Sequence, residues 1–347
     1  RAFRNEMNHR IFDVNAVTVL NEKIHNSSKN SFQILKSKRT TFTSIDLFAG
    51  AGGTALGLEH AGFKHEILVE YDPHACTTLR TNRPKWNILE QDVSKVDFQK
   101  YKNKIDLVEG GFPCQSFSYA GRRLGFTDTR GTLFYEFARC IKESRPKIAI
   151  GENVRGLIRH DDGKTLKIML HTLNELGYDV AWKLLRSQYF DVPQKRERIV
   201  IMAVRKDLKI PLLFPQERNY TISLRDALKD CPPSAGQDYP KHKKEILNLI
   251  PEGGYWRDLP LPLQKQYMGA SFYMGGGKTG MARRLSWDEP SFTLTCSPAQ
   301  KQTERCHPSE TRPLNVREYA RIQTFPDEWH FAGSVSAQYK QIGNAVP

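Results

Sequence analysis

Apolar runs of strand length alternate with amphipathic segments of helix length from about residue 43 to residue 206. The strand-like runs are TSIDLF, HEILVEYD, IDLVEG and KIAIGEN, and the pair YDVAWKLLRSQYF and RERIVIMAVR closes the series. Alternating strands and helices predict an α/β fold with an open, mostly parallel sheet covered by helices on both faces. Ligands of such sheets bind beyond the carboxyl ends of the strands, so the residues that follow each strand are candidates for function.

The alternation stops after Lys206, and this break predicts three regions. Residues 1–43 hold eight Lys and Arg against three Asp and Glu, which indicates a basic N-terminal arm that packs or touches phosphates. Residues 44–207 together with 312–347 form the α/β domain, because a helical pattern returns in RPLNVREYARIQTF. Residues 208–311 are rich in Pro and Gly, and we expect a smaller, irregular domain there.

The overall charge and the cysteine spacing restrict the class of protein. The 52 Lys and Arg exceed the 38 Asp and Glu by 14, which favours a nucleic-acid partner over a basic protein without one. No two of the six cysteines form a C-x-x-C pair, so we expect neither a structural zinc site nor a disulfide framework. We expect the protein to work in a reducing cytosol. No apolar run is long enough to span a membrane, and the polar N-terminus does not resemble a signal peptide.

A glycine-rich turn follows the strand TSIDLF. In DLFAGAGGTA, the residues Gly50, Gly52 and Ala55 match G-x-G-x-x-A, and Glu70 ends the next strand. This pattern is typical of dinucleotide sites, and the same geometry suits S-adenosyl-L-methionine or a tight turn without a ligand. In EQDVSKVD, the carboxylate of Asp92 either accepts from an adenine amino group or lies on a surface loop.

Cys114 lies in GGFPCQSFSYAG, in a loop that follows a strand. A lone cysteine is commonly an inert buried residue. Glu152 follows the neighbouring strand, and QKRERIV supplies Arg196 and Arg198. A thiolate, a carboxyl group and an arginine together suit attack on a cytosine ring, because the thiolate adds to C6, the carboxyl group contacts N3 and the guanidinium binds O2. Taken singly, the glutamate and the arginines are also typical of a solvated surface.

The motifs DLFAGAGG, FPCQSFS, GENV, QKRERI and QIGNAVP occur in this order, and the chain therefore resembles the cytosine-5 DNA methyltransferases. The resemblance covers about residues 44–207 and 312–347. It implies a Rossmann-like S-adenosylmethionine-dependent methyltransferase fold with a smaller, irregular target-recognition domain at 208–311. The family normally continues with a terminal helix after the stretch that ends here at Pro347, so the resemblance leaves open where that helix is.

The resemblance also implies roles for individual residues. Cys114 matches the nucleophile, and Glu152 matches the glutamate that contacts the ring. Arg196 and Arg198 match the arginine motif, and Arg198 is the better candidate for contact with the cytosine. The implied cofactor-binding residues are Phe48, Gly50, Gly53, Glu70, Tyr71, Asp92, Val93, Pro113, Leu133, Asn344 and Val346. The implied DNA-binding residues are Gln115, Ser118 and Arg122 on the loop after the cysteine, with Thr293 in the recognition domain. The local density of Lys and Arg around EPSFTLTCSPAQ adds Arg283 and Arg284. Either of the last two arginines reads a guanine or only contacts phosphate.

These observations lead us to expect a sequence-specific DNA (cytosine-5)-methyltransferase that flips a cytosine out of duplex DNA and belongs to a restriction-modification system. We expect S-adenosyl-L-methionine as the cofactor, no metal, double-stranded DNA as the partner, no membrane association, and a monomer in a prokaryotic cytoplasm, near the nucleoid. A tRNA methyltransferase of the same superfamily and a non-catalytic DNA-binding relative are the alternatives. A nicotinamide oxidoreductase would leave Cys114 and Glu152 unexplained.

Overall fold

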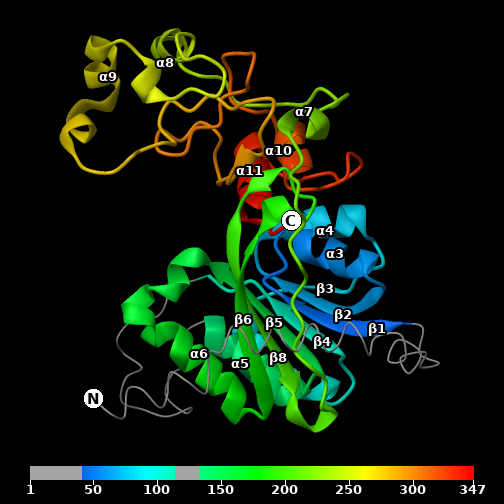
Figure 1. Cartoon of the computed structure of the whole chain (residues 1–347). Helices are drawn as coiled ribbons and strands as arrows, with labels where there is room; N and C mark the ends of the chain where they lie inside the picture. Colours follow the sequence, from blue (N-terminus) through cyan, green and yellow to red (C-terminus); the bar gives the residue numbers. More distant parts are fainter. Residues whose placement is uncertain (1–40, 114–132) are drawn as a thin grey trace, which may run out of the picture. The chain divides into compact units, whose positions relative to one another are not determined.

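The computed structural model describes residues 41–113 and 133–347. Seven strands form one sheet in the order β3-β2-β1-β4-β5-β8-β6 (Figure 1). The strands of this sheet are β1 (Phe42–Leu47), β2 (Phe63–Glu70), β3 (Ile88–Glu90), β4 (Leu107–Gly110), β5 (Ile148–Val154), β6 (Tyr178–Arg186) and β8 (Glu197–Arg205). β1 to β5 pair in parallel, so the predicted α/β fold with a mostly parallel sheet is confirmed.

Helices cover both faces of the sheet. Alternate residues of a strand point to opposite faces; Ile67 and Val69 of β2 accordingly pack into a core with α5 and α6, while Leu68 packs with α3, α10 and α11. The helices are α3 (Gly53–His60), α4 (Pro73–Asn82), α5 (Leu133–Ser144), α6 (Lys164–Glu175), α7 (Leu224–Ala227), α8 (Lys241–Leu247), α9 (Leu261–Met268), α10 (Val316–Ile322) and α11 (Val335–Asn344).

Strand β8 runs antiparallel to its neighbours β5 and β6. Its first residues therefore lie at the sheet edge where the parallel strands end. In this register, Arg198 at the start of β8 lies opposite Val154 at the end of β5. The reversal brings the QKRER motif to the edge that carries the other predicted site residues.

The glycine-rich turn connects β1 to α3 with several residues in the left-handed region. Phe48 has φ 59°, Gly50 has φ 52° and Gly52 has φ 88°, and the last two suit glycine because it has no Cβ. At Gly53 the reason for glycine is packing, since a Cβ there would lie 2.4 Å from the carbonyl oxygen of Val346. The closing QIGNAVP segment thus packs directly against the turn.

The segment between β8 and α10 has a hydrophobic core of its own. Tyr239, Trp256, Tyr267 and Met281 are among the buried side chains of this core, which spans residues 239–306. Leu285 and Leu294 of the same segment pack instead with α10 and α11. A separate two-stranded parallel sheet, β7 (Gln194–Lys195) with β9 (Ser291–Phe292), also joins this segment to the chain just before β8.

No described helix has both the length and the apolar composition that a membrane span needs. Among residues 41–113 and 133–347, no group of three or more His, Cys, Asp and Glu side chains is arranged to hold a metal ion.

Candidate active site

Glu152 and Arg198 form a close ion pair at the carboxyl edge of the sheet. Arg198 Nε lies 2.7 Å from Glu152 Oε1, and the two side chains are only 16% and 13% exposed. Burial raises the pKa of Glu152, while the neighbouring Arg198 and Arg196 lower it. Burial likewise lowers the pKa of Arg198, and the negative charge of Glu152 opposes this effect. The site therefore holds a carboxyl group that can exchange a proton beside a fixed cation.

Arg196 is more deeply buried than Arg198 and is bound to the backbone. Its guanidinium donates to the carbonyl oxygens of Leu294 (3.2 Å) and Gly343 (3.3 Å), and its side chain is 2% exposed. This places Arg196 behind the site, where it connects β8 to two distant segments. Of the two arginines, the geometry favours Arg198 for contact with a substrate.

A pair of buried glutamines, which the sequence reasoning did not identify, holds four motifs together. Gln194 Nε2 donates to Gln323 Oε1 (2.7 Å), and Gln194 Oε1 accepts from the Leu294 N–H (2.9 Å). Gln323 Nε2 in turn donates to the carbonyl oxygens of Ile342 (2.6 Å) and Ala345 (2.9 Å). Unpaired buried amides are costly, so these bonds fix the relative positions of the segments around the site.

Cys114, with Gln115, Ser118 and Arg122, lies outside the described residues. The chain that leads to them is described up to Pro113, which is exposed. A Cβ added at Gly111 would lie 3.3 Å from Glu152 Oε2, and Asn153 Nδ2 donates to the Phe112 carbonyl oxygen (2.8 Å). The segment before the cysteine thus passes directly beside the Glu152 carboxyl group.

Glu70 ends β2 and binds the glycine-rich turn. Its Oε2 accepts from the Gly50 N–H, and its Oε1 accepts from the N–H groups of Tyr71 and Asp72, each at 2.8 Å. A carboxylate has about four acceptor sites, so these three bonds leave capacity on Oε2 for one hydroxyl group of a ligand. The Tyr71 ring beside it is 76% exposed and presents an aromatic face.

The other predicted cofactor-binding residues lie on neighbouring elements of the same half of the sheet. Asp92 follows β3, is exposed, and accepts from the Ser94 N–H (2.8 Å), which lowers its pKa. Val93 is buried, and Leu133 begins α5 and packs against the core. Phe48 is partly buried in the turn after β1.

The end of α11 and the stretch after it reach the same region. Asn344 is exposed, and its Oδ1 accepts from the Cys296 thiol (3.0 Å). Val346 contacts the turn at Gly53. An ion pair of 3.0 Å between Lys340 of α11 and Asp72 at the start of α4 supports this packing.

Thr293 lies beside the ion pair of the site. Its hydroxyl donates to the Lys195 carbonyl oxygen (2.7 Å), and its carbonyl oxygen accepts from Arg305 Nε (3.1 Å). Thr293 and Arg198 line one groove of about 360 Å³ together with Arg155. A residue predicted to contact DNA and one predicted to contact the base are thus brought together.

The structure places Arg283 and Arg284 differently from the base-reading role that the sequence suggested. Arg284 is 5% exposed, and its guanidinium is surrounded by backbone carbonyl oxygens, including those of Ile250 and Leu247 at 2.8 Å each. Arg283 is 9% exposed and donates to the carbonyl oxygens of Thr279 and Gly253, at 2.7 Å each. In this conformation both arginines hold the segment together, and a guanine contact would require these bonds to break.

A buried carboxyl pair also escaped the sequence reasoning. Asp46 of β1 lies opposite Glu109 of β4, and they are 1% and 3% exposed. The oxygens of Asp46 meet no donor N–H or hydroxyl among the described residues, so their hydrogen bond requires a proton on one carboxyl group. Burial raises the pKa of both carboxyl groups, and the Asp46 charge raises that of Glu109 further, so the pair shares one proton. The sequence signal that could have revealed this pair is an acidic residue within each of two otherwise apolar strands.

Comparison with known proteins gives consistent matches over most of the chain. The family described as C-5 cytosine-specific DNA methylase matches residues 42–347. The Type II methyltransferase M.Eco47II of Escherichia coli is 62% identical over 322 residues, which cover 90% of this chain and 77% of that protein. M.Sau96I of Staphylococcus aureus is 55% identical over 317 residues, which cover 89% of this chain and 74% of that one. A crystal structure of a prophage-encoded DNA modification methyltransferase from Escherichia coli has a TM-score of 0.63 at 25% identity, covering 88% of this chain and 94% of that one.

Proposed function

Since the chain belongs to the C-5 cytosine-specific DNA methylase family, we propose that it methylates C5 of one cytosine within a specific duplex DNA sequence. The observation that carries this proposal is the buried Glu152–Arg198 pair beside the segment that leads to Cys114. A nucleophile, a proton-exchanging carboxyl group and a cation at one sheet edge are what activation of a cytosine ring requires.

The chain's own groups act on the ring in sequence. The thiolate of Cys114 adds to C6, and Glu152 donates a hydrogen bond or a proton to N3, so that the ring takes up the electron pair and C5 becomes nucleophilic. Once C5 carries the methyl group, loss of its proton to a base breaks the C6–S bond and releases the thiolate. The raised pKa of Glu152 suits this role because it favours a carboxyl group that still holds a proton. Arg198 orients Glu152 and binds O2, where negative charge accumulates.

S-adenosyl-L-methionine, when bound, supplies the electrophilic methyl group. The residues at the carboxyl edge fit such a ligand, since Glu70 retains acceptor capacity, Tyr71 exposes its ring, and the nearest atom to a Cβ on Gly50 is 3.9 Å away. Glu70 would hold a ribose hydroxyl, and Tyr71, Asp92, Val93 and Leu133 would surround the adenine. Phe48, Gly50, Gly53, Pro113, Asn344 and Val346 would enclose the methionine end. The reaction would leave S-adenosyl-L-homocysteine, and no metal is needed.

The DNA would lie between the site and the irregular segment, which we propose as the target-recognition domain at residues 208–311. A cytosine ring is shielded by stacking in duplex DNA, so the enzyme must flip it out. Gln115, Ser118 and Arg122 would lie against the opened duplex, and Thr293 would hold the strand near Arg198. The catalytic domain would comprise 44–207 and 312–347, with residues 1–43 as an arm.

The names of the relatives favour a biological role. M.Eco47II and M.Sau96I are Type II methyltransferases, and a methyltransferase of this type protects DNA in a restriction-modification system. We propose the same role here, exercised by a monomer in the cytoplasm, near the nucleoid.

The test uses labelled S-adenosyl-L-methionine with unmethylated genomic DNA and with total tRNA. The unchanged chain is compared with Cys114→Ser and with Glu152→Gln. Label on C5 of DNA cytosine that is lost in Cys114→Ser and strongly reduced in Glu152→Gln is the expected result. Label on tRNA alone, or DNA label that persists in Cys114→Ser, would contradict the proposal.

A further inference from the structure

Two adjoining grooves lie beside the site, at the edge formed by β5, β8 and β6. The inner groove, of about 360 Å³, is lined by Arg198, Lys195 and Thr293. The outer groove, of about 460 Å³, is lined by Lys183, Arg186 and Glu217. Arg155 and Glu197 line both grooves, so the two adjoin at these side chains, and we refer to them together as the basic groove.

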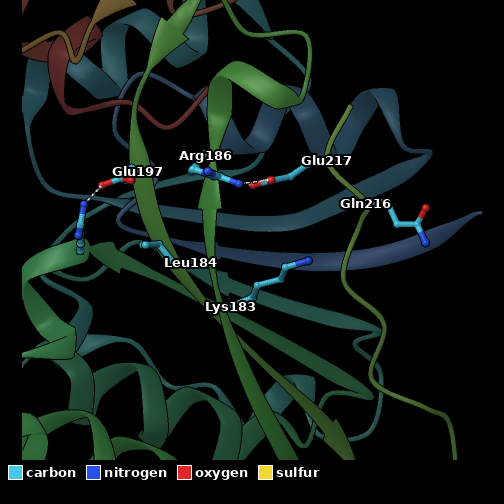
Figure 2. A pocket seen from close by; sticks show the side chains of 7 residues that line it. Lys183, Leu184, Arg186, Glu197, Gln216 and Glu217 are labelled. Carbon is cyan, nitrogen blue, oxygen red and sulfur yellow. Dashed lines mark hydrogen bonds and ion pairs between the residues drawn. The ribbon is translucent and has the colours of Figure 1, made fainter. Parts of the chain in front are cut away.

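Strand register explains how the basic groove is built. Arg198 lies opposite Val154 of β5 and Leu185 of β6, and Glu197 lies opposite Arg186. Arg155 directly follows β5, in the short helical turn Arg155–Ile158. Figure 2 shows Lys183 and Arg186 on β6 facing the segment that carries Gln216 and Glu217. The inner groove thus begins at Arg198, and the outer groove lies beyond Arg155 and Glu197, along β6.

The charge of the basic groove suits an anion. Its lining has five cationic side chains, Arg155, Lys183, Arg186, Lys195 and Arg198, against the carboxylates of Glu197 and Glu217. Lys195 pairs with Glu289, which does not line the basic groove. In the described part of the chain, Lys183 has no ion pair.

The ion pairs within the basic groove are exposed and therefore exchangeable. Arg155 Nη1 lies 2.7 Å from Glu197 Oε2, with the two side chains 61% and 35% exposed. Arg186 binds Glu217 through two nitrogens, with the Nε–Oε1 distance 3.0 Å, and is 48% exposed. Exposed pairs contribute only about 0–1 kcal/mol in water. A phosphate can replace either carboxylate at little cost, since arginine binds both in the same forked geometry.

We propose that the basic groove binds the phosphodiester backbone of the DNA strand that carries the flipped cytosine, with Lys183 and Arg186 contacting phosphates beyond those next to the base. This inference rests on the proposed function, because Arg198, the partner of Glu152, lines the inner end of the basic groove. In the free protein, Glu197 and Glu217 hold the arginines in position, and the DNA backbone displaces them.

The test measures affinity for a fluorescently labelled duplex by anisotropy over a range of salt concentrations. The Lys183→Gln/Arg186→Gln variant is compared with Arg205→Gln/Lys206→Gln, which removes the same charge at the opposite end of β8. Each phosphate contact contributes about 0.9 to the slope of log K against log salt. The first variant should bind more weakly, with a slope shallower by about 1 to 2, and the control should keep the slope of the unchanged chain.

Glu217→Gln gives a result that misfolding cannot imitate. Freeing Arg186 from its carboxylate should tighten DNA binding and steepen the salt dependence. Wild-type affinity and slope in the Lys183/Arg186 variant, an equal loss in the control, or a loss of tRNA binding without a loss of DNA binding would each overturn the inference. Failure of the proposed function would appear in a different experiment, the labelling assay, in which the wild-type protein would then place no methyl group on DNA.

Discussion

Replacing Arg198 by Met should destabilise the protein in a pH-dependent manner. The Glu152 and Arg198 side chains are 13% and 16% exposed, so the substitution leaves a buried carboxyl group without its closest cation. Removing one partner of a buried pair costs about 3–5 kcal/mol when the other stays charged. The unfolding entropy grows with chain length, so a chain of this size should lose roughly 1.5 °C per kcal/mol, and the melting temperature should fall by about 5–8 °C.

The full loss is expected only at high pH, because Glu152 can take up a proton. Burial already raises the pKa of Glu152, and Arg198 is the largest opposing influence. In the variant the folded-state pKa therefore rises further above the unfolded value. The contribution of this group to stability is then fully present below the unfolded pKa and is lost as the pH rises through the folded pKa.

Thermal unfolding between about pH 5 and about pH 9 measures this difference. Adding Glu152→Gln to Arg198→Met makes both partners neutral and should restore most of the stability, as in a double-mutant cycle. A deficit that is constant with pH, or one that Glu152→Gln does not relieve, would refute the reasoning, since the loss would then come from packing rather than from the buried charge.

Three further predictions concern buried contacts. Glu109→Gln should raise the melting temperature, and the gain should grow as the pH rises. The amide of Gln donates to Asp46 at any pH, whereas the carboxyl group of Glu109 must stay protonated at pH values above its ordinary pKa. Calorimetry over a range of pH measures the difference. Gly53→Ala should cost about 1–3 kcal/mol in urea unfolding and weaken S-adenosyl-L-methionine binding in calorimetry, since its Cβ would overlap the Val346 carbonyl oxygen, 2.4 Å away. Gln323→Leu should cost about 1–3 kcal/mol for each buried group left unpaired, and slower labelling of DNA should accompany the lower melting temperature.

Much of the fold could be predicted because its signals are local. Alternation of apolar runs with amphipathic segments depends on neighbouring residues only, and it placed β1, β2, β4, β5, β6 and β8 correctly, while the short strands β3 and β7 were not predicted. The ends of parallel strands converge at one sheet edge, so residues after β1, β2, β4 and β5 could be expected to meet there. Glu152, Glu70 and the turn at Gly50 do lie at that edge.

The roles of the arginines could not be predicted from local sequence signals. Arg196, Arg198, Arg283 and Arg284 all looked like accessible cations in the sequence. Of these four, only Arg198 forms an ion pair with Glu152, while Arg196 and Arg284 are enclosed by carbonyl oxygens from distant segments. A guanidinium serves equally well as a backbone clamp and as a ligand contact, so its surroundings decide its role.

The sequence alone therefore determined the elements, the chemistry available and the order of the motifs, because strand periodicity, turn residues and side-chain type are properties of short stretches. The tertiary structure decided the antiparallel placement of β8, the sharing of a proton between Asp46 and Glu109, and the joining of four motifs by Gln194 and Gln323. Each of these depends on the register between strands or on hydrogen bonds between separate segments, 19 to 129 positions apart for the two glutamines. Such contacts are set by the balance of packing and burial over the whole chain, which no short stretch contains.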